Sequence, residues 1–233
     1  MVDTPTPDFD AITHLGNTEI QHGKYNDRIY LMHLAREDYP EILPRLEEIA
    51  GKKRYSKIFA KVPAWARAAF LQAGYEVEAE VPGFFGGETD GLFLGRFLDE
   101  DRARPQRPQR IEEVLEAARA KAGTAEKNPG LAEGMELREC GPGDVESIVA
   151  VYREVFETYP FPIHDPAYIR ETMDTHVRYF GVFRGEELIA LSSTEMHRED
   201  GNVEMTDFAT LPPARGSGAA QALLARMDEE MAR

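Results

Sequence analysis

The stretch EMTDFATLPPARGSGAAQ, residues 204–221, decides the fold of this chain. It begins with β-branched and aromatic residues that are typical of a strand, is broken by two prolines, and continues as a glycine-bearing turn. Apolar residues then recur at helical spacing, at Ala220, Leu223, Leu224, Met227 and Met231. The sequence therefore predicts a strand, a turn and a helix in uninterrupted order.

The turn has the composition of an anion-binding site. Gly216 and Gly218 lack Cβ atoms where a backbone must approach a ligand closely, and the free N–H groups of a helix start point outward with the positive end of the helix dipole. Arg215 can add a charge-assisted bond to phosphate oxygens. The alternative is a glycine-rich surface turn before an ordinary amphipathic helix. The residues expected to hold the anion are Arg215, Gly216, Ser217, Gly218, Ala219 and Ala220.

The spacing Arg215-x-x-Gly218-x-Ala220 after a strand resembles the acetyl-CoA motif of the GNAT acetyltransferases, Arg/Gln-x-x-Gly-x-Gly/Ala. No Gly-Lys-Ser/Thr follows as in the Walker loop, and the spacing differs from the dinucleotide fingerprint Gly-x-Gly-x-x-Gly. The resemblance implies acetyl-CoA as co-substrate. It also implies that the backbone of Phe208, Ala209 and Thr210 pairs with the pantetheine arm and holds the thioester carbonyl.

The composition is that of a globular protein without a nucleic-acid partner. The formal charge of −15 and a pI near 4.9 oppose binding to a phosphate backbone, and suit a cationic small substrate. An acidic surface that merely keeps the protein soluble is the simpler alternative. No apolar run approaches the ~20 residues of a membrane span, and the N-terminus is acidic, so we expect a cytoplasmic protein. Cys140 is the single cysteine and the six histidines are scattered, so no metal site is predicted.

The chain is predicted to contain four segments. Residues 1–21 are expected to form a loosely ordered leader, and residues 22–98 a β-α-β-α-β-β unit. That unit resembles the second half of a GNAT domain, since Phe70 and Gly74-Tyr75 match the spacing late in the helix of that half. The family often has a general-acid tyrosine where this unit has Phe70, so the resemblance implies that this copy of the half-domain is structural and not catalytic. Residues 99–134 are a charged, proline-bearing linker with one helix, which carries Ile111 and Val114. Residues 135–233 are the acetyl-CoA-binding GNAT domain.

The predicted fold class is α/β (α+β), with a mixed and mostly antiparallel GNAT-type sheet flanked by helices. A GNAT domain continues beyond the motif helix with a further strand, helix and strand pair, whereas this sequence stops at Arg233. Either the given sequence is a fragment that lacks these elements, or the N-terminal unit supplies them in permuted order. The fragment is favoured, because an internal half-domain plus a full domain is the simpler history.

Several separated stretches narrow the resemblance within the GNAT class. The chain resembles the beta-lysine N-acetyltransferases in five stretches, which are spread from about residue 22 to the end: HGKYNDRIYLMHL, YSKIFAKVPA, EVPGFF, ETYPFPIHDPAYI and TDFATLPPARGSG. These enzymes pair with a lysine aminomutase to make the osmolyte N-acetyl-beta-lysine. The resemblance implies acetyl transfer to the side-chain terminal amine of (3S)-beta-lysine.

An ammonium group must lose a proton before its nitrogen can attack a thioester, so the chemistry needs a base. Glu204 and Asp207 are the catalytic candidates, although either carboxylate could simply face solvent. Residues three apart on a regular strand face opposite ways, so both reach one pocket only if a bulge lies between them, as GNAT domains usually have here. Glu195 is a further candidate for binding the ammonium. Tyr159 and Phe161, in the connection that often lines the acceptor pocket, are candidates to wall the substrate's aliphatic chain, or else pack a loop.

Two other functions stay open at this point. A broader amine or amino-acid N-acetyltransferase would share every feature up to the acceptor loop. A non-catalytic acyl-CoA-binding GNAT-like protein would bind acetyl-CoA without turnover. A homodimer is one assembly that the sequence leaves open.

Overall fold

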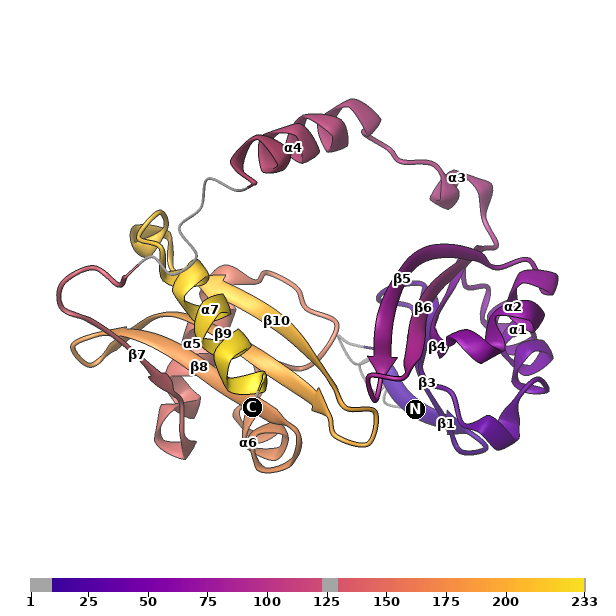
Figure 1. Cartoon of the computed structure of the whole chain (residues 1–233), viewed down its shortest axis with the longest axis horizontal. Helices are drawn as coiled ribbons and strands as arrows, with labels where there is room; N and C mark the ends of the chain where they lie inside the picture. The colour runs from indigo at the N-terminus through magenta and orange to yellow at the C-terminus, as the bar shows by residue number, and fades with distance from the viewer. Residues whose placement is uncertain (1–9, 123–129, 233) are drawn as a thin grey trace, which may run out of the picture. The chain divides into compact units, whose positions relative to one another are not determined.

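The computed structural model describes residues 10–122 and 130–232 (Figure 1). Within this part of the chain the strands form one sheet of six and one of four. The strands are β1 (Ala11–Leu15), β2 (Thr18–Gly23), β3 (Arg28–His33), β4 (Lys57–Pro63), β5 (Glu76–Phe85), β6 (Thr89–Phe97), β7 (Met135–Glu139), β8 (Val177–Arg184), β9 (Glu187–His197) and β10 (Asn202–Thr210). The α-helices are α1 (Ile42–Lys53), α2 (Arg67–Gln72), α3 (Glu100–Ala103), α4 (Pro108–Lys121), α5 (Val145–Val155), α6 (Pro166–Thr175) and α7 (Ala219–Met231).

The six-stranded sheet has the order β1-β2-β3-β4-β6-β5. β3 and β4 are parallel and are joined through α1, whereas the other neighbouring strands are antiparallel. Helices α1 and α2 cover one face, because Leu46 and Phe70 point into a core with Ile29, Ile58 and Leu94 of the strands. The predicted β-α-β-α-β-β order is confirmed from β3 to β6.

The prediction of a loosely ordered leader is wrong for residues 11–21, which form most of the hairpin β1–β2. Leu15 pairs with Thr18, so Gly16 and Asn17 are a two-residue turn, and Gly16 has the positive φ of 73° that such a turn needs. Asp38 holds the turn, since its carboxylate accepts hydrogen bonds from the N–H groups of Asn17 and Thr18 at 2.8 Å. Residues 1–9 of the expected leader lie outside the described residues.

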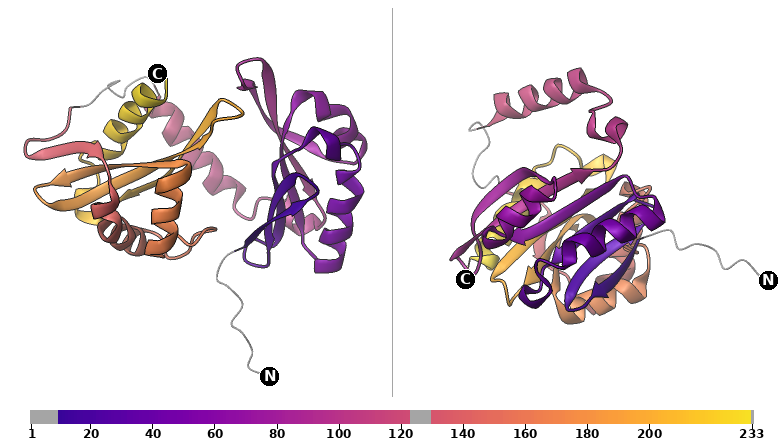
Figure 2. Two further views of the ribbon diagram at one scale, coloured as in Figure 1. Left: turned by 90° about the horizontal axis from the view of Figure 1, so that it is seen from below. Right: turned by 90° about the vertical axis from the view of Figure 1, so that its right-hand side faces the viewer.

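The four-stranded sheet has the order β10-β9-β8-β7 and is antiparallel throughout. Helices α5 and α6 cover one face and α7 covers the other (Figure 2). Alternate residues of β8 divide between these faces: Tyr179 packs with Tyr152 of α5, and Phe180 packs with Leu223 of α7. The predicted fold class, a mostly antiparallel sheet flanked by helices, is confirmed.

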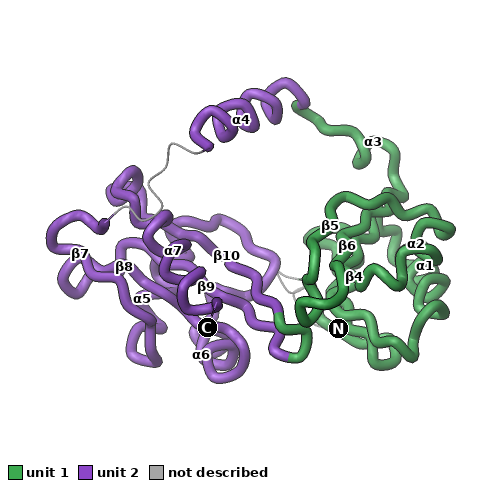
Figure 3. Tube along the Cα trace, in the orientation of Figure 1, with its two compact units in different colours: residues 1–107, 199–201 green, residues 108–198, 202–233 purple. Residues whose placement is uncertain are grey.

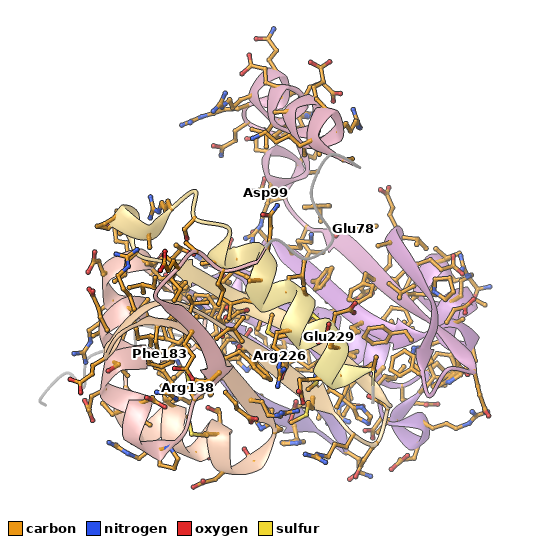
Figure 4. The ribbon with its side chains drawn as sticks, turned by 60° about the vertical axis from the view of Figure 1, so that its left-hand side comes forward. Glu78, Asp99, Arg138, Phe183, Arg226 and Glu229 are labelled. Carbon is orange, nitrogen blue, oxygen red and sulfur yellow. The ribbon has the colours of Figure 1, made fainter. Side chains whose placement is uncertain are left out.

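Arg138 on β7 ties the first strand of this sheet to the start of α5. Its guanidinium donates to both carboxylate oxygens of Asp144 at 2.8 Å, and it lies 3.8 Å from the centre of the Phe183 ring (Figure 4). Asp144 also accepts from the N–H group of Gly141 at 2.8 Å. The pair therefore fixes the loop that leads into α5.

The chain divides into two compact units, residues 1–107 with 199–201 and residues 108–198 with 202–233 (Figure 3). The border at 107 and 108 falls inside the predicted linker 99–134. That linker contains α3 and α4, where one helix was expected, and its residues 123–129 lie outside the described residues. The Asp99 side chain caps α3, because it accepts hydrogen bonds from the N–H groups of Asp101 and Arg102.

Candidate active site

A β-bulge in β10 brings the acidic candidates of this strand to one face of the sheet. Thr206 pairs with Ser193 and Ala209 pairs with Leu191, so β10 advances three residues while β9 advances two. Asp207 lies in the bulge with a φ of 58°, in the left-handed region. The bulge expected from the resemblance is therefore present, and it lets the Asp207 side chain share the face of its neighbour Thr206.

The Asp207 carboxylate accepts hydrogen bonds on both of its oxygens. The Tyr159 hydroxyl donates to Oδ1, and the Ser193 hydroxyl donates to Oδ2 at 2.9 Å. The Thr206 hydroxyl lies 3.3 Å from Oδ1. Burial, together with the nearby Asp207 charge, raises the pKa of Tyr159, so this phenol stays protonated and acts as a donor.

Three more tyrosines pack in or against the core on the same face of the sheet. Tyr152 of α5 is fully buried, and burial and the Asp207 charge raise its pKa well above the ordinary value. Burial raises the pKa of Tyr179 to about 12, and its hydroxyl lies 2.8 Å from that of Thr172. Burial also raises the pKa of Tyr168. These phenols are neutral at physiological pH, so none of them serves as a ready base.

Two further carboxylates stand next to the bulge. Glu204 of β10 pairs directly with Glu195 of β9, and directly opposed residues of antiparallel strands point to the same face. Glu204 is exposed, whereas Glu195 is half-buried and its Oε1 lies 3.7 Å from Nε2 of His197. Glu195, Glu204 and Asp207, predicted separately from the sequence, thus lie on one face of two neighbouring strands.

The turn between β10 and α7 has an open surface. Gly216 and Gly218 have φ values of 81° and 83°, and in the described part of the chain a Cβ added at Gly216 would meet nothing within 4 Å. The first turn of α7 has no side-chain cap, so its N–H groups are available to a ligand. The Ser217 hydroxyl is buried and, among the described residues, has no hydrogen-bond partner.

The neighbouring candidates frame this turn. Arg215 is exposed, and its Nε donates to the carbonyl oxygen of Thr210 at 3.3 Å. β10 is an edge strand of the described sheet, so the outer backbone groups of Phe208 and Thr210 are not paired within it. Ala219 packs into the core beneath α7, whereas Ala220 is exposed.

Comparison with known proteins identifies the family of this chain. Residues 147–233 match the model of the acetyltransferase (GNAT) family. A beta-lysine N(6)-acetyltransferase of Methanococcus maripaludis is 34% identical over 225 residues, which are 96% of this chain and 80% of that protein. The chain belongs to the GNAT acetyltransferase family. It is an N-acetyltransferase, and its relatives do not favour a non-catalytic acyl-CoA-binding protein.

Other relatives of this acetyltransferase extend over most of the chain. A beta-lysine N(6)-acetyltransferase of Methanosarcina mazei is 25% identical over 83% of this chain and 78% of its own length. The N-acetyltransferase YodP of Bacillus subtilis is 29% identical over 91% of this chain and 76% of its own. Among solved structures, a GCN5-related N-acetyltransferase from Kribbella flavida covers 95% of this chain and 74% of its own, at 12% identity and a TM-score of 0.44.

Sequence reasoning missed some residues of the candidate site. Ser193, Thr206 and Tyr168 were not predicted, because their relevance depends on the register of β9 and β10 and on how α6 packs. Phe161 is partly buried against the core beneath α5 and α6, which fits a packing role as well as a pocket wall. Tyr159 packs against the same core, and its hydroxyl reaches Asp207.

Within residues 10–122 and 130–232, no group of three or more His, Cys, Asp or Glu side chains is arranged to hold a metal ion. In the same ranges, no helix combines the length and the apolar character that crossing a membrane requires.

Proposed function

We propose that this acetyltransferase moves the acetyl group of acetyl-CoA to the side-chain terminal amine of (3S)-beta-lysine, forming the compatible solute N-acetyl-beta-lysine. The observation that carries the proposal is the 34% identity over 96% of the chain to a protein named beta-lysine N(6)-acetyltransferase. This identity spans both compact units, so it reaches well beyond the donor-binding motif that GNAT proteins share. The acidic face of β9 and β10 supports a cationic acceptor.

The turn between β10 and α7 is the proposed site for the pyrophosphate of acetyl-CoA. The uncapped N–H groups of α7, the two glycines and the exposed Arg215 fit an anion, and the buried Ser217 hydroxyl offers a further donor. The outer edge of β10, which no further strand of the described sheet covers, is proposed to pair with the pantetheine arm at Phe208, Ala209 and Thr210. The thioester would then lie beside the bulge.

The acceptor amine is proposed to bind at the carboxylates on the α5–α6 face. A lysine-type ammonium has a pKa of about 10.4, so it must be held and deprotonated before reaction. Glu204 and Asp207 are the candidates for this base, and Glu195 is proposed to bind an ammonium group. The connection that carries Tyr159 and Phe161 is proposed to line the acceptor pocket.

The transfer itself is proposed to be direct. The base removes one proton from the ammonium, the amine nitrogen attacks the thioester carbon, and the tetrahedral intermediate collapses with cleavage of the C–S bond. The second proton leaves the nitrogen, and the departing sulfur is protonated to give CoA thiol. The buried tyrosines, which keep their protons, take no part as bases.

The test is release of CoA thiol with acetyl-CoA and beta-lysine, compared with alpha-lysine and spermidine. Turnover selective for beta-lysine, with acetylation of the terminal nitrogen verified by mass spectrometry and NMR, is the expected result. Equal turnover of all three amines would instead support the broader amine acetyltransferase. Acetyl-CoA binding without turnover of any amine would contradict the proposal. Cytoplasmic location and a homodimer stay predictions.

A further inference from the structure

The Asp207 carboxylate is held by hydroxyl donors from two different elements. One hydroxyl donates to each of its oxygens, from Tyr159 and from Ser193. Each carboxylate oxygen has a second lone pair, so the group can accept further donors without giving these up. An ammonium group with three N–H donors satisfies that capacity.

The backbone at Asp207 is held in a conformation that costs energy. A φ of 58° lies in the left-handed region, which is unfavourable for a residue with a Cβ, and such residues persist where the surroundings over-determine them. Here the Ser192 hydroxyl donates to the carbonyl oxygen of Thr206 at 2.6 Å, which fixes the bulge from the buried strand β9. The carboxylate of Asp207 is therefore aimed by the backbone as well as by its hydrogen bonds.

Tyr159 connects this bulge to the segment between α5 and α6, residues 156–165. The Tyr159 ring lies 5.2 Å from that of Phe156, and Arg153 donates to the carbonyl oxygen of His164 at 2.7 Å, which closes the other end of the segment. The hydroxyl of Tyr159 thus joins the proposed acceptor loop to a carboxylate 48 residues further along the chain. A wall for an aliphatic chain would not need this hydroxyl.

We infer that Tyr159 and Ser193 are positioning residues that hold Asp207 as a fixed anionic ligand for the acceptor's ammonium group. This inference rests on the proposed amine acetyltransferase function. It assigns different roles to the two acidic candidates of β10: Asp207 binds the ammonium group, and the exposed Glu204 accepts the proton. The substrate class is a primary amine that arrives as a cation.

The test compares Tyr159→Phe and Ser193→Ala with a matched control, Tyr179→Phe. Each variant removes one hydroxyl, but the Tyr179 hydroxyl contacts Thr172. Loss of a hydrogen bond to the charged carboxylate should raise KM for the amine about 10- to 100-fold in the first two variants. KM for acetyl-CoA should stay within about twofold and kcat within about threefold. Ser193→Thr keeps the hydroxyl and should restore most of the amine affinity.

Three outcomes would overturn the inference. The first is an unchanged KM for the amine in Tyr159→Phe and Ser193→Ala. The second is a loss of melting temperature and activity equal to that of Tyr179→Phe, which would indicate a purely structural role. The third is a fall in kcat with no change in amine affinity.

Failure of the proposed substrate is recognised separately. If the wild type does not acetylate beta-lysine but acetylates another amine of the panel, the proposed substrate is wrong, and the same variants are compared with that amine. If no amine is acetylated, calorimetry measures beta-lysine binding to the CoA-saturated protein in the wild type and each variant. Wild-type binding that Tyr159→Phe weakens supports the inference without turnover. No binding by the wild type would overturn both proposals.

Discussion

Glu195 of β9 and Glu204 of β10 are directly paired across two antiparallel strands, so two carboxylates stand side by side on one face of the sheet. Like charges that are directly opposed in a sheet are destabilising. The arrangement is therefore a cost to folding that a bound cation would offset. Because Asp207 lies on the same face, this region carries a local excess of negative charge at the site proposed for the acceptor's ammonium group.

Replacement of one member of this pair should separate stability from activity. Glu204→Gln removes the like-charge repulsion while keeping the shape of the side chain. The free energy of unfolding should therefore increase by less than ~1 kcal/mol, and the melting temperature should rise slightly. If Glu204 is the base, kcat should fall about 10²- to 10⁴-fold. Steady-state kinetics and thermal denaturation check both effects. Glu186→Gln, in the exposed β8–β9 turn, is the control, and an equal loss of kcat in this control would exclude a specific role for Glu204.

Arg215 provides a test of the donor site that does not involve the acceptor. Arg215→Ala removes a charge-assisted bond to phosphate that is worth about 1–3 kcal/mol of binding free energy. KM for acetyl-CoA should therefore rise roughly 5- to 150-fold, with little change in KM for the amine. Arg226→Ala is the control, since Arg226 lies in α7, beyond the turn that carries Arg215 (Figure 4). The Arg226 side chain pairs with Glu230 at 2.7 Å. Unchanged acetyl-CoA affinity in Arg215→Ala would remove the pyrophosphate assignment.

Local sequence patterns were sufficient for most elements of both sheets. The Arg184-Gly185 turn between β8 and β9, the Pro-Pro break after β10 and the helical spacing in α7 each follow from residues that are close in sequence. The hairpin β1–β2 also had such a signal, because Gly16-Asn17 is a typical two-residue turn, but the polar residues around it obscured the strands. The helix α1 runs through Gly51, and Arg54 takes the left-handed position at its end.

The site depends on relationships that no local pattern contains. The resemblance predicted a bulge in β10, but only the register with β9 locates it at Asp207. The contact between Tyr159 and Asp207 joins residues 48 apart in sequence, and the Ser193 contact depends on strand pairing. Three carboxylates could therefore be nominated from the sequence, whereas which of them is held by neighbouring hydroxyls could not.

Asp144 should make the acetyltransferase less stable in acid. The Arg138 guanidinium hydrogen-bonded to it holds the pKa of Asp144 below its ordinary value. A depressed folded-state pKa stabilises the native state above the unfolded value of about 3.9, and this contribution is lost as the pH falls through the folded-state pKa. Asp144→Asn should lower stability by about 1 kcal/mol at pH 7, and its difference from the wild type should shrink as the pH falls below about 3.9 and disappear below the folded-state pKa of Asp144. Denaturation at a series of pH values measures this, and a difference that is independent of pH would contradict the assignment.

Cys140 should be dispensable for acetyl transfer. Its side chain is buried, and burial raises the pKa of the thiol to about 12, so the nucleophilic thiolate is scarce at neutral pH. A covalent acetyl-cysteine intermediate would require that thiolate, whereas direct attack by the amine does not. Cys140→Ala should therefore keep kcat within about twofold, although the small cavity should lower the melting temperature. Iodoacetamide should leave native Cys140 unmodified at pH 8 and react with it after denaturation. An acetylated Cys140 peptide in protein quenched during turnover would contradict direct transfer.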